Sequence, residues 1–149
     1  APQNHRCEDS VQLMDLSSTI MELAGLPVPG NWEACSLLPM IRSGEWVGEA
    51  PRRYAYAELG RDHIQSSAEH LIMRRDDEFK FVIYPGSDEG ELYALQDDPD
   101  EINNLWRDPN HRERRDRAVT EILAWSVLGS YQAHRMPTPK PQVPMTIKR

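Results

Sequence analysis

The chain has 149 residues with 39% apolar content and a formal net charge of −7, enough for one compact domain or for part of a larger one. The acidic balance argues against a nucleic-acid-binding surface. No apolar run approaches the roughly 18 residues of a membrane span, so neither nucleic acid nor a membrane is an expected partner.

The chain contains two cysteines, Cys7 and Cys35. They lack the spacing of a zinc site, and we expect no metal site in this chain. Two free thiols are the simplest reading, although a single disulfide between them stays open. Free thiols favour a cytoplasmic location. A secretory or periplasmic location is the alternative, because a signal segment could precede Ala1.

A helix is predicted from Val11 to Ala24, because apolar residues recur there at steps of three and four. These residues are Leu13, Leu16, Ile20 and Leu23. Gly25 is a fitting helix stop. Asp15, in the first turns, is expected to complement the helix dipole or to face solvent. Only loop-like residues precede this helix, so we expect its apolar stripe to pack on a larger structure outside the chain.

Proline and glycine punctuate the following residues, which predicts a linker held to a core by a short apolar group around Leu37 and Leu38. Four strand-like runs then occupy residues 52–59, 71–75, 79–84 and 91–95. In the third run Phe79, Phe81 and Ile83 alternate with Lys80, Val82 and Tyr84. The connections between the runs are short, and they predict an antiparallel sheet.

A second helix is predicted from about Asn110 to Val127, with an apolar side that would cover one face of the sheet. Gly129 is expected to end it. The tail that follows contains four prolines in "MPTPKPQVPMTIKR", which disfavour helix and favour an extended chain. Such a tail is either disordered or laid across a neighbour, so a homo-oligomer formed through the tail is one expectation.

The stretch "LYALQDDPDEINNL", residues 92–105, follows the rules for a helix start. Asp98 is an expected N-cap, Pro99 suits the first helical position, and Glu101 would complete a capping box. Leu105 would then anchor the chain to the core. The spacing and the glycine of an EF-hand calcium loop are missing, so this segment is interpreted as structural rather than catalytic.

This stretch also resembles the C-terminal signature of the type I sulfatases, the arylsulfatase-like branch of the alkaline phosphatase superfamily. Two earlier stretches resemble the family in the same order: "VQLMDLSSTIMELAGLPVP" at residues 11–29 and "CSLLPMIRSG" at residues 35–44. Together the resemblance covers about residues 8–128. Ala94 replaces a common Asp, and Ser18 stands where proline is common.

The resemblance implies an α+β fold: a small antiparallel sheet of about four strands packed by a C-terminal helix, and before it a helix belonging to the large α/β sulfatase domain. The expected divisions are residues 1–30 for the last helix and exit loop of that N-terminal domain, 31–51 for a linker, 52–129 for the C-terminal subdomain and 130–149 for an extended tail.

Sulfatases of this family hydrolyse sulfate esters with a formylglycine, made from the first residue of a C/S-x-P-x-R motif, beside a Ca²⁺ or Mg²⁺ ion. Neither Cys7 nor Cys35 begins such a motif. The resemblance therefore implies that the nucleophile and the cation belong to an N-terminal part outside this chain, and that this chain holds no catalytic residue and is inactive alone.

The implied function is that of the C-terminal fragment of a sulfatase, which supplies a wall of the substrate groove. Arg61 and His63, after the first predicted strand, are the candidate substrate-binding residues, because loops there can approach the groove. The expected partners are the N-terminal sulfatase domain and a sulfate-ester substrate. A non-catalytic binding or assembly module and the tail of a phosphonate or phosphate monoester hydrolase are the alternatives.

Overall fold

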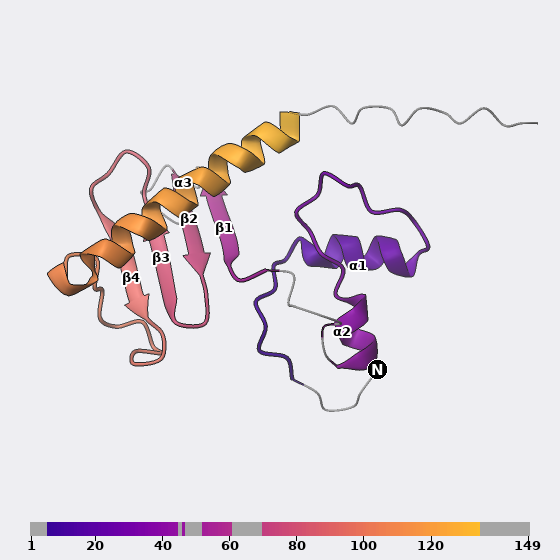
Figure 1. Ribbon diagram of the computed structural model, residues 1–149, viewed down its shortest axis with the longest axis horizontal. Helices are drawn as coiled ribbons and strands as arrows, with labels where there is room; N and C mark the ends of the chain where they lie inside the picture. The colour runs from indigo at the N-terminus through magenta and orange to yellow at the C-terminus, as the bar shows by residue number, and fades with distance from the viewer. Residues whose placement is uncertain (1–5, 45, 47–51, 61–69, 135–149) are drawn as a thin grey trace, which may run out of the picture.

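The computed structural model describes residues 6–44, 46, 52–60 and 70–134 (Figure 1). Three α-helices, four strands and one 3₁₀ helix occur there. In chain order they are α1 (Asp15–Leu23), α2 (Leu38–Ser43), β1 (Ala55–Gly60), β2 (His70–Arg75), β3 (Phe79–Ile83), β4 (Gly90–Ala94), η1 (Pro109–His111) and α3 (Arg112–His134). Within these ranges no helix is long and apolar enough to cross a bilayer.

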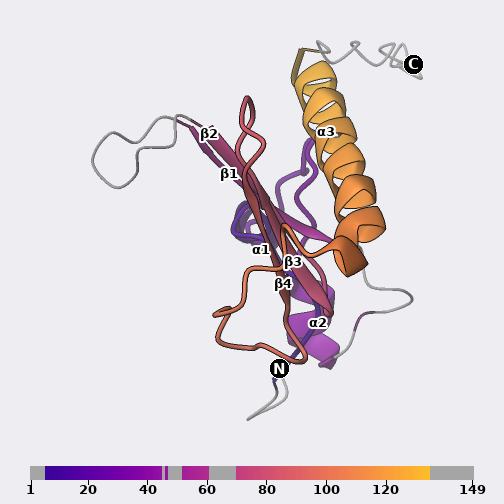
Figure 2. The ribbon, with the colours of Figure 1, turned by 90° about the vertical axis from the view of Figure 1, so that its left-hand side faces the viewer.

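The four strands form one antiparallel sheet in the order β1-β2-β3-β4, as the sequence predicts. The register places Phe81 opposite Arg74 on one side and Leu92 on the other. Figure 2 shows α3 lying across one face of this sheet. Consecutive short strands pair with their chain neighbours because each connection is too short for a crossover. The predicted α+β class is therefore confirmed.

The hydrophobic core lies between the sheet and α3. It consists of Ile72, Phe81, Ile83, Leu92, Trp106, Ala118 and Ile122. Phe81 and Ile83 of β3 belong to this core and Phe79 packs against it, as predicted, but burial does not alternate along the strand, because Val82 is buried as well. Full burial of each large apolar side chain contributes about 1.5–3 kcal/mol, so the packing under α3 is the main source of stability of the sheet.

The helix α3 is longer than the sequence predicts. Asp108 caps η1 by accepting a hydrogen bond from Asn110 N at 2.9 Å, and α3 then runs without a break through Gly129 to His134. The expectation that Gly129 ends the helix is wrong. A glycine inside a helix lowers its stability by only about 0.5–1 kcal/mol relative to alanine. The helix therefore continues on both sides of Gly129. The expected boundary between residues 129 and 130 thus falls inside α3.

The turn at Asp98 differs from the predicted helix start. The Asp98 carboxylate accepts hydrogen bonds from Ile102 N at 3.1 Å and Asn103 N at 2.8 Å. Glu101 has a left-handed backbone with φ 55, which a helix does not accommodate. Its carboxylate pairs with Lys80 instead of closing a capping box. The capping box is therefore a wrong prediction, and the segment is a loop closed by Asp98.

The end of the same motif anchors the loop to β4, as predicted for Leu105. Leu105 N donates to Leu92 O at 2.8 Å, and its side chain packs against the core. Asn104 adds three hydrogen bonds: its Oδ1 accepts from Leu92 N at 3.1 Å and from Trp106 N at 2.9 Å, and its Nδ2 donates to Gly90 O at 3.0 Å. The motif thereby holds Trp106 over the sheet.

Gly90 is the position most sensitive to this packing, and we predict that Gly90→Ala destabilises the fold. An added Cβ would lie 2.5 Å from Cζ2 of Trp106, closer than ordinary contacts allow. Overpacking of this kind costs about 1–3 kcal/mol, so thermal unfolding followed by circular dichroism should show a midpoint several degrees lower. Gly30→Ala is the control, because a Cβ there meets no atom within 4 Å. An unchanged midpoint for Gly90→Ala would show that Trp106 moves aside freely.

Candidate functional site

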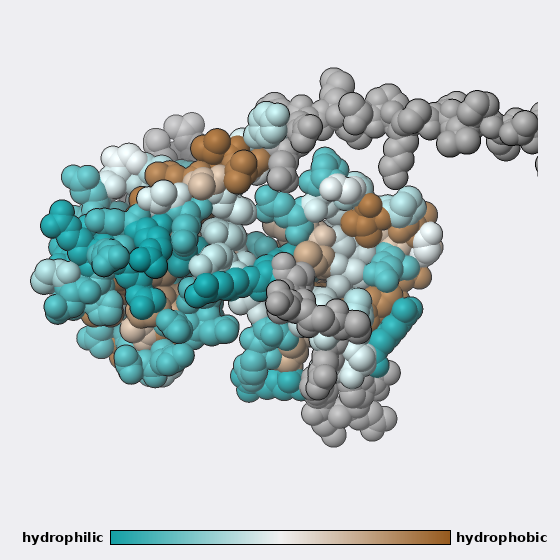
Figure 3. Space-filling model, viewed as in Figure 1, coloured by the Kyte–Doolittle hydropathy of each residue, from teal (hydrophilic) through white to brown (hydrophobic). Residues whose placement is uncertain are grey.

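The helix α1 turns its apolar side outward. Leu13 is 84% exposed, and Leu16, Ile20 and Leu23 are 49%, 65% and 63% exposed. Figure 3 shows apolar residues gathered at the surface in the region of α1, with a second group over α3. The predicted amphipathic helix is confirmed, although it begins at Asp15 rather than Val11. These four residues are called the outer face of α1 below.

The inward side of α1 is polar. Asp15, Ser18 and Thr19 are its buried residues. Thr19 Oγ1 donates to Asp15 O at 2.7 Å and accepts from Leu37 N at 2.8 Å. Ser18 Oγ is buried and has no hydrogen-bond partner in the described part of the chain. This is the position where proline is common in the resembling family, so the environment of Ser18 does not require a hydroxyl.

Asp15 is the centre of this polar side, and the expectation that it faces solvent or only complements the helix dipole is wrong. The residue is 1% exposed. Its Oδ1 accepts from Cys35 N at 2.9 Å and from Arg52 Nη2 at 2.8 Å. Its Oδ2 accepts from Gln12 N at 2.7 Å and from Arg52 Nη1 at 2.6 Å. Four donors thus satisfy the carboxylate.

The ion pair between Asp15 and Arg52 is buried, with side chains 2% and 11% exposed. Burial by itself lowers the pKa of Arg52, but the hydrogen bonds to Asp15 and the charge of Asp15 outweigh it, and the pKa is raised. Removing one partner of such a pair leaves an uncompensated charge and typically costs about 3–5 kcal/mol. Asp15 and Arg52 therefore fix the polar side of α1 inward, which leaves its apolar side exposed.

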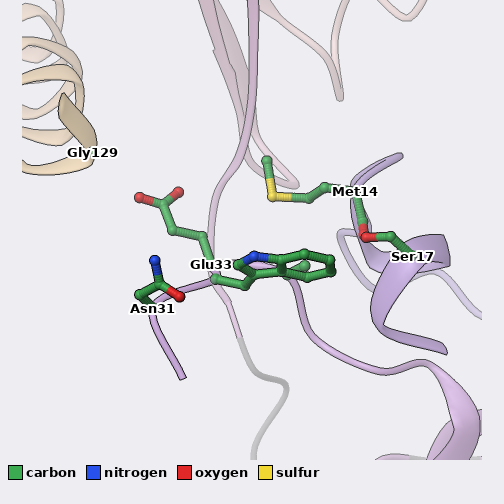
Figure 4. A pocket seen from close by; sticks show the side chains of 7 residues that line it. Met14, Ser17, Asn31, Glu33 and Gly129 are labelled. Carbon is green, nitrogen blue, oxygen red and sulfur yellow. The ribbon is translucent and has the colours of Figure 1, made fainter. Parts of the chain in front are cut away.

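A pocket of about 510 Å³ lies between α1 and α3 (Figure 4). In that view Asn31 and Glu33 stand on one side, and Met14 and Ser17 on the other. Glu33 Oε2 accepts a hydrogen bond from Trp125 Nε1 at 3.0 Å. The predicted packing role holds for Trp125, whose ring stacks on Tyr56 with centroids 4.3 Å apart.

The two predicted substrate-binding residues, Arg61 and His63, lie outside the described residues, and their role stays a prediction. Glu58 on β1 lies close to His70 on β2, with His70 Nε2 3.0 Å from Glu58 Oε1. Glu58 pairs across strands with Ile72 rather than with His70, so this contact is diagonal. Sequence reasoning missed this contact, because a diagonal contact depends on the register of β1 against β2.

Cys7 and Tyr84 have raised pKa values. Among the described residues no group of three or more His, Cys, Asp or Glu side chains could hold a metal ion. Cys7 and Cys35 are free thiols, and the hydrogen bond from Cys7 Sγ to Asp9 raises the pKa of that thiol. A hydrogen bond to Glu91 raises the pKa of Tyr84 to about 12. Both side chains therefore remain protonated and weakly nucleophilic near neutral pH.

Comparison with known proteins points to one family. Residues 1–126 match the family described as N-sulphoglucosamine sulphohydrolase, C-terminal. An uncharacterized protein of Haemophilus influenzae is 31% identical over 117 residues, 78% of this chain and 57% of that protein. Arylsulfatase K of Xenopus laevis is 28% identical over 118 residues, 76% of this chain and 22% of that protein.

The fold is similar to that of solved hydrolases. The crystal structure of a phosphonate monoester hydrolase of Agrobacterium radiobacter superposes with a TM-score of 0.62 at 27% identity, over 77% of this chain and 24% of that one. The chain thus spans little more than half of the Haemophilus protein and under a quarter of the two named enzymes. The chain belongs to the N-sulphoglucosamine sulphohydrolase C-terminal family, a C-terminal region of the sulfatases in the alkaline phosphatase superfamily.

Proposed function

We propose that this chain is the C-terminal part of a sulfuric ester hydrolase and that the outer face of α1 docks it on an N-terminal catalytic α/β domain. The observation that carries the proposal is the inverted orientation of α1, which buries Asp15 and exposes leucines and an isoleucine. A contiguous apolar surface of this kind marks an interaction site. The family match makes a catalytic sulfatase domain the natural partner.

In this proposal the chain supplies a wall of the substrate groove rather than the reacting groups. Arg61 and His63 are the candidates for contact with a sulfate-ester substrate, since cationic side chains pair with an anionic sulfate group. The formylglycine does not fit this chain, because no cysteine or serine begins a C/S-x-P-x-R motif. The Ca²⁺ or Mg²⁺ ion does not fit the described residues, since no group of three or more His, Cys, Asp or Glu side chains there could hold it. Both are assigned to the N-terminal domain.

Two alternatives have an observation in their favour. The likeness to the phosphonate monoester hydrolase favours a phosphonate or phosphate ester as the substrate, since these esters share a tetrahedral anionic centre with sulfate esters. The Haemophilus protein, of which this region makes up more than half, favours a non-catalytic binding module. The sulfatase reading takes precedence because the matched family and the arylsulfatase relative both carry that activity in their names.

The outer face of α1 should be accessible to a hydrophobic dye in the isolated chain. We predict that Leu16→Gln combined with Ile20→Gln lowers the fluorescence of bound anilinonaphthalene sulfonate by more than half. Both side chains are exposed, so the fold should be retained. Glu22→Gln, an exposed change on the same helix, is the control and should leave dye binding unchanged. Equal dye binding by all three proteins would place the apolar surface elsewhere and remove the support for docking through α1.

The isolated chain should not turn over an ester substrate. With Ca²⁺ or Mg²⁺ present, we expect no release of nitrophenol from para-nitrophenyl sulfate or from para-nitrophenyl phenylphosphonate, because the nucleophile and the cation site are assigned elsewhere. Peptide mass spectrometry should show Cys7 and Cys35 as unmodified cysteines. Turnover that copurifies with the chain and disappears in a Cys7→Ala or Cys35→Ala variant would contradict the assignment.

A further inference from the structure

The described elements form two packed groups. The sheet group consists of β1–β4, η1 and α3, and the hydrophobic core lies within it. The helical group consists of α1, α2 and the segment between them, with α1 packed on α2 and Leu37 and Leu38 buried. Figure 1 shows the two groups side by side. Neither α1 nor α2 contributes a residue to the core cluster of the sheet group.

Directional polar contacts connect the two groups. Gln12 Nε2 donates to Tyr56 O on β1 at 2.7 Å. Trp125 Nε1 on α3 donates to Glu33 Oε2 at 3.0 Å. Arg52, which precedes β1, binds Asp15 through both Nη atoms. These three connections are called the bridges below.

One bridge ends on the Asp15 carboxylate, and the other two start from segments whose backbone Asp15 or Arg52 binds. The Asp15 carboxylate accepts a hydrogen bond from the backbone N–H of Gln12, whose side chain forms the first bridge. Arg52 Nη2 also donates to the backbone oxygen of Glu33 at 3.0 Å, and Asp15 holds the backbone N–H of Cys35, two residues further on. The position of the Glu33 side chain, and with it the second bridge, therefore depends on Asp15 and Arg52.

Between the bridges, an open pocket separates the two groups. The pocket of about 510 Å³ has walls from both of them, Met14 and Ser17 from α1 and Gly129 from α3. Hydrogen bonds and one ion pair thus join the two groups across this hollow, while neither α1 nor α2 reaches the core of the sheet group.

From this geometry we infer that Asp15, Arg52, Glu33 and Trp125 form a polar joint, which sets the angle between α1 and the sheet and opens without unfolding the sheet group. Asp15 and Glu33 are positioning residues in this joint. The sheet group keeps its own core when the joint opens, and regions that lack apolar contacts open first. The outer face of α1 then determines where the chain docks, and the joint determines how the sheet is held relative to that surface.

The joint can be tested in the 149-residue chain by nuclear magnetic resonance, with the indole N–H groups as reporters. Asp15→Asn keeps the size of the side chain but removes the charge that holds Arg52. We expect the backbone amides of Gln12 and Cys35 to exchange with solvent at least about tenfold faster. The Trp125 indole signal should shift and exchange faster as well, although Asp15 does not touch Trp125. Glu22→Gln is the matched control and should change neither.

The same spectra contain an internal reference for the sheet group. Trp106 Nε1 donates to Asp88 O at 2.9 Å and belongs to the core. Its indole signal and the amides of β3 should keep their protection in Asp15→Asn. Loss of protection at Trp106 together with Gln12 would show a single cooperative unit and overturn the joint. An unchanged Trp125 signal would show that the bridges are independent, which overturns it equally.

Glu33 provides a second variant that does not depend on the folding of Asp15→Asn. Glu33→Gln keeps an amide oxygen as acceptor for Trp125 Nε1 and should preserve the indole signal. Glu33→Ala removes the acceptor and should reproduce the effect of Asp15→Asn at Trp125 while leaving Trp106 unchanged. Identical Trp125 signals in both Glu33 variants would contradict the second bridge. These measurements use no substrate. A negative result for the joint therefore leaves the proposed function standing, and a negative result for the proposed function leaves the joint standing.

Discussion

The buried carboxylate of Asp15 is the constraint on which the amino-terminal part of the structure depends. A buried charge is costly unless it is paired and fully hydrogen-bonded, and Asp15 meets this condition with donors from Gln12, Cys35 and Arg52. Successive helical residues are about 100° apart, so turning Asp15 and Thr19 inward turns Leu16 and Ile20 outward. The exposed apolar face of α1 is thus a direct consequence of where one carboxylate is satisfied.

The two groups of elements are stabilised in different ways. The sheet group is held by apolar burial under α3, with Phe81, Leu92 and Ile122 at its centre. The helical group buries Leu37 and Leu38 and adds hydrogen bonds to side chains of α1. Apolar burial is a non-directional force, whereas a bidentate ion pair is directional. This division suits a chain that keeps a stable sheet and presents a helix in a defined direction to a partner.

The sheet and the helices were predictable because their signals are local. Alternation predicts β3, short connections predict antiparallel pairing, and steps of three and four predict α1 and α3. The capping box failed because Lys80, distant in sequence, takes the Glu101 carboxylate and Glu101 adopts a left-handed backbone. The role of Asp15 was hidden for the same reason, since its partners lie 3, 20 and 37 residues away. In the sequence, only the position of Asp15 on the helix side opposite the apolar residues indicates that Asp15 is buried.

Side-chain amides occupy both outer strands of the sheet. Asn104 takes up the N–H of Leu92 and the C=O of Gly90 on β4, while Gln12 takes up the C=O of Tyr56 on β1. Free backbone groups on an outer strand are a template for pairing with another chain. By occupying three of these groups, the two residues reduce the backbone edge that the outer strands offer to another chain, in a protein that already exposes leucines on α1.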